Sequence, residues 1–74
     1  MYTITIQGPK GVYMIFEHIN KISYKTAVEN ITLEGEDIFT HRYSTHYDLH
    51  LFSETDAYTV SKTSIEVIQV TKEN

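Results

Sequence analysis

The sequence predicts a mainly β protein, a small antiparallel meander, barrel or sandwich of five to six short strands in a single domain over residues 1–74. Three observations predict this class. Ile, Val, Thr and Tyr, which favour strands, recur throughout the chain. Apolar and polar residues alternate with a period of two in several short segments. Turn-forming residues separate those segments at short intervals, as in meanders and small barrels.

The length of the chain allows one compact core, because a polypeptide of 74 residues buries only about 60% of the surface that its unfolded form exposes. The chain has no cysteine, which excludes disulfides and thiolate metal sites. A well-packed sheet, an oligomer, or a metal held by histidine and carboxylate remain as sources of stability. We expect the sheet, in a homo-oligomer.

The first half of the chain predicts a hairpin, and the residues that follow it fit either a strand or a helix. Residues 2–7 alternate strictly, with Tyr2, Ile4 and Ile6 on one face, which predicts a half-buried strand. Gly-Pro-Lys-Gly at 8–11 predicts a turn into an antiparallel partner. Residues 12–22 favour a strand in their first part, but their apolar residues also fit a helical spacing, which would give an α+β fold.

The remaining segments predict further strands. A turn near Asn20 precedes an alternating run over 22–33, with a bulge or bend near Glu29 and Asn30. The acidic run 34–37 predicts a solvated turn, 44–52 a strand and 53–56 a polar connection. Residues 57–60 predict a short strand, 61–64 a polar break, and 65–70 a closing strand. Because that last strand carries apolar residues on both faces, we expect it in a central position, a barrel wall or an oligomer contact.

Charge and hydropathy exclude several classes of function. The net charge is −4 and the six basic residues are scattered, so nucleic acid is an unlikely partner. No apolar stretch approaches the roughly 20 residues of a membrane span, and the first residues lack a signal-peptide pattern. We therefore expect a cytoplasmic protein without membrane contact.

His46, Asp48 and His50 form the sharpest local feature, because alternation along a strand would place all three on one face. Imidazole and carboxylate suit a divalent transition metal, and His41 could add a ligand. The alternative is that these side chains face water beside a core face that includes Tyr47 and Leu49, and need no ligand. Structural metal sites usually bring four ligands, so we expect no cofactor.

The sequence does not predict an enzyme. The acidic residues gather in turns, where carboxylates are normally solvated, and no cysteine nucleophile is present. Tyrosine is the more suggestive residue type, because its apolar ring and polar hydroxyl favour interfaces. We expect contacts with a protein partner from two tyrosines, a histidine and the acidic loop, namely Tyr13, Tyr43, His41, Glu34, Glu36 and Asp37.

The function that these patterns predict is that of a small non-enzymatic binding protein that engages a protein partner, with help from a sheet edge. In size and composition, though in no specific motif, the chain resembles the accessory proteins of phages and mobile elements that inhibit a host factor. One alternative is an oligomeric sequestrant that holds a nucleotide or another small anion with Lys10, Lys25 or Arg42. The other is a structural subunit of a larger assembly.

Overall fold

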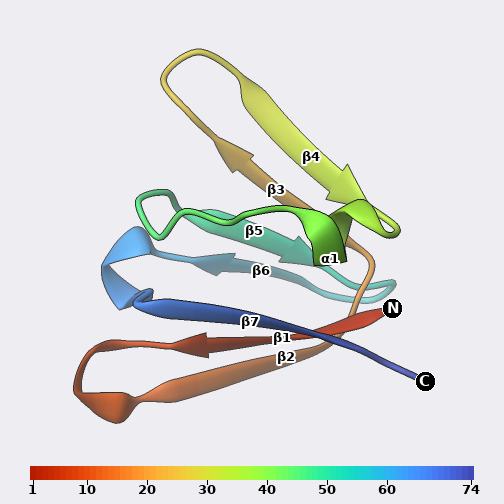
Figure 1. Cartoon of the computed structure of the whole chain (residues 1–74), viewed down its shortest axis with the longest axis horizontal. Helices are drawn as coiled ribbons and strands as arrows, with labels where there is room; N and C mark the ends of the chain where they lie inside the picture. The colour runs from red at the N-terminus through yellow and green to blue at the C-terminus, as the bar shows by residue number, and fades with distance from the viewer.

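The computed structural model describes residues 1–74 and contains seven strands, one short helix and two 3₁₀ turns (Figure 1). The order along the chain is β1 (Tyr2–Gln7), η1 (Pro9–Gly11), β2 (Tyr13–Ile19), β3 (Lys21–Lys25), β4 (Asn30–Glu34), α1 (Asp37–Thr40), β5 (Leu49–Phe52), β6 (Ala57–Val60), η2 (Lys62–Ser64) and β7 (Val67–Lys72). None of the helical segments has the length and hydropathy that crossing a bilayer requires.

The strands form two antiparallel sheets, which confirms the predicted fold class. Sheet A has the order β2-β1-β7, and sheet B has the order β4-β3-β5-β6. The chain passes from sheet A to sheet B at a single residue, Asn20, whose amide donates to the carbonyl oxygen of Phe52 at 2.9 Å. It returns through η2, between β6 and β7 (Figure 1).

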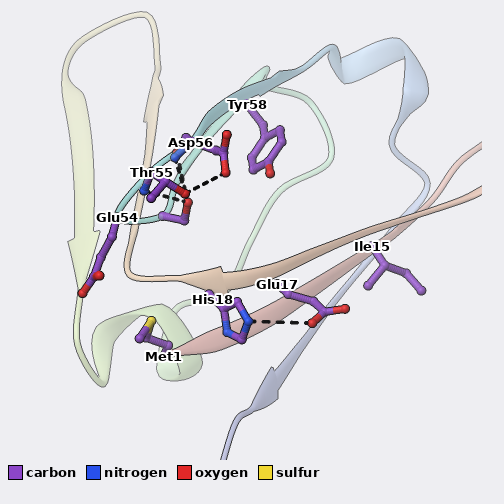
Figure 2. Close-up of a pocket in the computed structure, with 9 residues that line it drawn as sticks. Met1, Ile15, Glu17, His18, Glu54, Thr55, Asp56 and Tyr58 are labelled. Atoms are coloured by element: carbon purple, nitrogen blue, oxygen red, sulfur yellow. Dashed lines mark hydrogen bonds and ion pairs between the residues drawn. The ribbon is translucent and has the colours of Figure 1, made fainter.

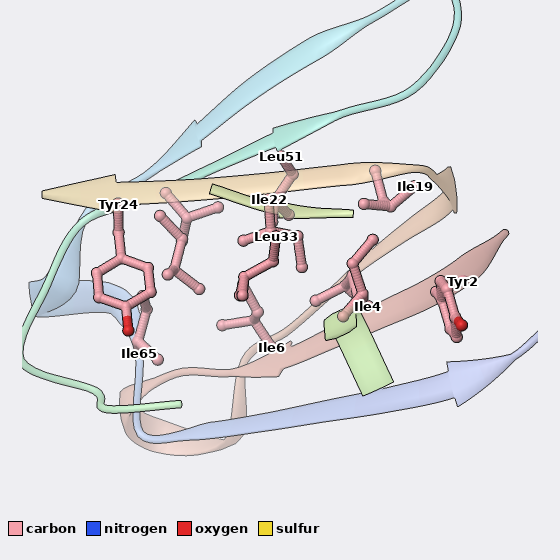
Figure 3. Close-up of a cluster of buried hydrophobic side chains, with 12 residues drawn as sticks. Tyr2, Ile4, Ile6, Ile19, Ile22, Tyr24, Leu33, Leu51 and Ile65 are labelled. Atoms are coloured by element: carbon pink, nitrogen blue, oxygen red, sulfur yellow. The ribbon is translucent and has the colours of Figure 1, made fainter. Parts of the chain in front are cut away.

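The inner faces of both sheets meet in one apolar core (Figure 3). The predicted alternation of β1 is confirmed, since its even residues are buried and its odd residues are half-buried. No polar or charged residue is buried with them. The core consists of twelve side chains from both sheets, α1 and the segment before β7: Tyr2, Ile4, Ile6, Ile19, Ile22, Tyr24, Leu33, Ile38, Leu49, Leu51, Val60 and Ile65.

The predicted hairpin at 8–11 is confirmed. The Gly8 amide donates to the Val12 carbonyl oxygen at 2.7 Å, and Lys10 and Gly11 take the positive φ angles of 64° and 77° that reverse the chain. The helical alternative for 12–22 is wrong. β2 pairs with β1, so Ile15, which a helix would bury, stays 62% exposed while Ile19 is fully buried.

The run expected over 22–33 has its interruption near the predicted place, but this is a full chain reversal at 26–29 and not a bulge or bend, so β3 and β4 form a hairpin. The hydroxyl of Thr26 accepts the amides of Val28 and Glu29 at 3.3 and 3.1 Å. The Thr26 amide closes the turn by donating to the Glu29 carbonyl at 2.9 Å. This turn contains neither Gly nor Pro, so the alternation of its residues concealed it.

The strand expected over 44–52 begins only at Leu49. The preceding residues form a loop held by side chains. The Ser44 hydroxyl accepts the His46 amide at 3.1 Å, and Oδ1 of Asp48 accepts the Lys62 amide at 2.8 Å. The even positions of 44–48 therefore do not share a strand face.

The C-terminal region is partly as expected. β6 has the predicted bounds, and 53–56 connects β5 to β6. The acidic run turns at Gly35, which has a φ of 59°, and leads directly into α1. The central position expected for the closing strand is wrong, because β7 is an edge strand that pairs only with β1. One apolar face of β7 belongs to the core, because Ile68 and Val70 pack against it. The other face carries Val67, which is 50% exposed.

Candidate functional site

Three large apolar side chains lie uncovered on the outer face of sheet A. Tyr13 and Ile15 of β2 are each 62% exposed, and Val67 of β7 is 50% exposed. Tyr13 and Val67 are both paired with Gln7 of β1, so Tyr13, Gln7 and Val67 form one row across the sheet. Ile15 lies in the next row, opposite Thr5. Tyr13, Ile15 and Val67 are called the outer patch below.

The surroundings of the outer patch are polar but almost uncharged. The outward residues of β1 and the exposed residues that face the same way on β7 are threonine and glutamine: Thr3, Thr5, Gln7, Gln69 and Thr71. Glu17 is the charged residue on this face of β2. A neutral, flat surface of this kind loses little solvation when another protein covers it.

The outer patch borders an unpaired strand edge. Antiparallel ladders alternate between residues that exchange backbone hydrogen bonds and residues that do not. The bond from the Gly8 amide to the Val12 carbonyl assigns the even residues of β2 to the bonded positions facing β1. The amides of Tyr13, Ile15 and Glu17 and the carbonyls of Tyr13 and Ile15 therefore point away from β1, towards an edge that no strand covers.

A groove of about 550 Å³ lies along this edge, between β2 and the β5–β6 hairpin (Figure 2). Below it, the rings of Phe16 and Tyr58 pack with centroids 4.9 Å apart and close the core. The lining includes the carboxylates of three acidic residues and no lysine or arginine. The full set is Met1, Ile15, Glu17, His18, Ser53, Glu54, Thr55, Asp56 and Tyr58.

One end of the groove is fixed by a polar clamp around Glu73. Its Oε2 accepts the Thr3 hydroxyl at 2.7 Å and the His18 amide at 2.8 Å, while Oε1 lies 2.9 Å from Nδ1 of His18. These contacts, the His18 amide first, lower the pKa of Glu73 to about 2, and the carboxylate raises the pKa of His18. His18 has a positive φ of 61° where the β1–β2 register shifts, so the clamp holds an irregular strand end in place.

Of the predicted partner-binding residues, Tyr13 is exposed, but His41 and Tyr43 are half-buried. The Tyr43 hydroxyl donates to the Ile38 carbonyl at 2.6 Å, and burial raises the pKa of this phenol well above its usual range. The Nε2 of His41 lies 2.7 Å from the Tyr24 hydroxyl, and its ring meets Tyr43 edge-on. Both side chains are engaged in packing the loop onto sheet B.

The acidic residues of the predicted partner-binding set are not gathered at the groove. Glu36 accepts the Tyr2 hydroxyl at 3.2 Å and pairs with Nζ of Lys72 at 3.1 Å, and Lys72 lowers its pKa. Glu34 lies opposite Lys21 in the β3–β4 register, and Asp37 is exposed in the first turn of α1.

The predicted metal ligands line a second, smaller cleft of about 300 Å³, called the loop cleft below. No three histidine or carboxylate side chains come together in a way that could hold a metal ion. The Asp48 carboxylate is engaged with the Lys62 amide, and Nδ1 of His50 lies 3.1 Å from the Thr59 hydroxyl. The lining is Lys25, His46, Tyr47, Asp48, His50 and Lys62, so of the predicted anion-binding residues it contains Lys25 but not Lys10 or Arg42.

Together, the fold and this surface define a small antiparallel β protein of two sheets in which the β2 edge is open and partly apolar. The chain matches no protein-family model, no curated protein and no solved structure.

The sequence predicted only one residue of this surface, Tyr13, and it did not predict Ile15, Val67 or the acidic groove. The period-two pattern of 13–17 places Ile15 beside Tyr13, whereas only the register of β1 with its two neighbours brings Val67 to the same row.

Proposed function

We propose that this chain is a non-enzymatic binding protein that engages a protein partner through the outer patch and the adjoining free edge of β2. The observation that carries the proposal is the coincidence of these two features on one side of sheet A. An exposed apolar group favours burial, and an unpaired edge offers backbone donors and acceptors to an incoming strand. Either feature alone is common on protein surfaces, but here Tyr13 and Ile15 supply both.

The expected consequence for the partner is inhibition. A partner bound at the outer patch would have that part of its own surface covered, and other ligands could not reach it. The outer patch is small, and Tyr13 is the residue in it that most often carries binding energy at interfaces. We therefore propose Tyr13 as the principal contact, with Ile15 and Val67 around it.

Site-specific photocrosslinking tests this proposal. p-Benzoylphenylalanine would replace Tyr13 in one variant and Thr32, on the outer face of sheet B, in a matched control, both expressed in the cells of origin. We expect position 13 to form a covalent adduct with one distinct polypeptide and position 32 to form none. An adduct with a second copy of the chain, equal labelling from both positions, or no adduct from position 13 would contradict the proposal.

A second candidate function rests on the loop cleft. Two lysines and two histidines surround it, and the single carboxylate among them already accepts a backbone hydrogen bond. Lysine recognises phosphate as a point charge, and a histidine ring N–H can donate a hydrogen bond to it, so the cleft suits a small anion such as a nucleotide. Calorimetry with inorganic phosphate and AMP, compared between the native chain and Lys25→Gln/Lys62→Gln, tests this alternative. Equal heats from both proteins would exclude it.

A further inference from the structure

We propose that the free edge of β2 takes up an extended, basic segment of the partner as an eighth strand, seated in the acidic groove. This inference rests on the function proposed above and specifies the chemistry of the partner. Three observations carry it, and they concern the backbone of β2, the side chains of the groove and the length of the open edge.

The backbone observation is the row of unpaired groups on β2. The amides of Tyr13, Ile15 and Glu17 and the carbonyls of Tyr13 and Ile15 point outwards, and no side chain of the protein bonds to them. Many edge strands are protected by an inward-pointing lysine, a proline or a covering loop. β2 has no lysine or proline between residues 13 and 19, and its irregular residue, His18, comes only after the open stretch.

The second observation is the charge of the groove. Glu17 approaches it from β2, and Glu54 and Asp56 approach it from the β5–β6 hairpin (Figure 2). The neighbouring cationic groups are the α-amino group of Met1 and His18, whose Nδ1 is paired with Glu73 and whose Nε2 lies 3.9 Å from Oε2 of Glu17, so that Glu54 and Asp56 have no cationic side chain beside them in the groove. A second copy of this chain would bring three more carboxylates to the same place, whereas lysine or arginine side chains would complement them.

The third observation is the length and alternation of the site. From Tyr13 to Glu17 the edge offers five residues, a span of about 17 Å for a paired strand. The side chains of an added strand would alternate between two environments. One set would lie beside Phe16 and Tyr58 and favour apolar residues, and the other would lie beside Ile15 and Glu17 and favour basic ones. The expected segment therefore alternates β-branched and basic residues.

Peptide binding tests the charge requirement. The probe is the labelled, end-capped peptide Thr-Arg-Val-Lys-Val-Arg-Thr, and its control has glutamate at the three basic positions. In a fluorescence anisotropy titration we expect the basic peptide to bind at least tenfold more tightly than the acidic one. Reversal of two groove charges, Glu17→Lys/Glu54→Lys, should abolish that preference. Glu29→Lys, a charge reversal at a residue that does not line the groove, should retain it.

Two proline variants test the edge itself. Ile15→Pro removes an amide that points to the open edge of β2, and Thr32→Pro removes the equivalent outward amide from β4, the edge of sheet B. We expect loss of peptide binding for Ile15→Pro only, with both variants shown to be folded by circular dichroism. In NMR titrations of the native chain, the amides of Tyr13, Ile15 and Glu17 should shift most and gain protection from exchange.

The outcomes separate this inference from the proposed function. No binding of the basic peptide up to about 1 mM, binding that Ile15→Pro leaves unchanged, or shifts centred on another element would overturn the added-strand proposal. A dimer that Ile15→Pro dissociates would overturn it too, by making a second copy the occupant. If the position-13 adduct persists in Glu17→Lys/Glu54→Lys, the protein-binding function stands while the basic-strand inference fails. If the peptide binds at β2 but position 13 forms no adduct in cells, the edge takes up a basic strand as inferred, while the proposed contact of Tyr13 with a cellular partner fails.

Discussion

The outer faces of the two sheets differ in whether other side chains cover their large apolar residues. On sheet B, Phe52 is covered by Lys21, whose Nζ lies 4.7 Å from the ring centroid. Phe39 of α1 remains 43% exposed, but Nζ of Lys72 lies 4.4 Å from its ring centroid. On sheet A, Tyr13 and Ile15 have no such cover, although both lie in the regular part of the β1–β2 register, opposite Gln7 and Thr5. The exposure of these β2 side chains is the observation on which the proposed contact with a partner rests.

The largest expected contrast is between the inner and the outer face. Leu51→Ala removes a fully buried side chain from sheet B and should lower the free energy of unfolding by about 2–5 kcal/mol. Ile15→Ala on the outer patch should change it by less than about 0.5 kcal/mol. Urea denaturation measures both. A loss for Ile15→Ala comparable to that of Leu51→Ala would assign the outer patch to the fold and remove the distinction between the two faces.

A smaller effect is expected at Tyr43, the half-buried tyrosine beside sheet B. Tyr43→Phe removes the donor to the Ile38 carbonyl and should cost about 1 kcal/mol, or up to about 3 kcal/mol if the carbonyl stays dry. Tyr13→Phe, its match on sheet A, removes a hydroxyl for which the fold provides no partner and should be nearly neutral. Thermal unfolding of the two variants makes the comparison. Equal losses would mean that the Tyr13 hydroxyl has a structural role.

The polar clamp around Glu73 should make the stability of the protein depend on pH. The folded-state pKa of Glu73 is about 2, below its ordinary value of 4.5, so its contribution is complete above about pH 5 and is lost as the pH falls towards 2. His18 has a raised pKa, so its contribution is present below pH 6.5 and is lost as the pH rises through its folded-state value. Glu73→Gln should flatten both limbs of a plot of melting temperature against pH. An unchanged profile would show that the clamp does not hold the strand end.

The smallest effect is expected where a cation covers an aromatic ring. Lys21→Gln should lower the free energy of unfolding by about 0.5 kcal/mol, because the contact with Phe52 is exposed and screened by salt. It should also leave peptide binding unchanged, since Lys21 lies on sheet B. Chemical denaturation at low and high salt measures the first effect and anisotropy the second. If the substitution creates a new peptide site, uncovered aromatic side chains alone would explain binding.

The candidate site was predicted only in part. Tyr13 could be found because a hairpin at 8–11 starts a strand whose alternate residues face outwards. His41 and Tyr43 carry no local sign of their burial, since the loop that contains them packs through contacts with Tyr24 and Ile38. The metal prediction depended on a strand that would begin before Leu49. The Asp48 side chain instead accepts the Lys62 amide, from a residue distant in the sequence.

Local patterns were sufficient for the elements whose signals lie within a few residues, including the alternation of 2–7, the Gly-Pro-Lys-Gly turn and the short strand at 57–60. A strand's period and a turn's backbone angles depend on neighbouring residues, so the mainly β class follows from them. The assignment of strands to two sheets, the edge position of β7 and the groove beside β2 depend on which distant backbones pair. Tertiary structure alone decides them, because long-range pairing is selected by burial of the whole core and not by any one segment.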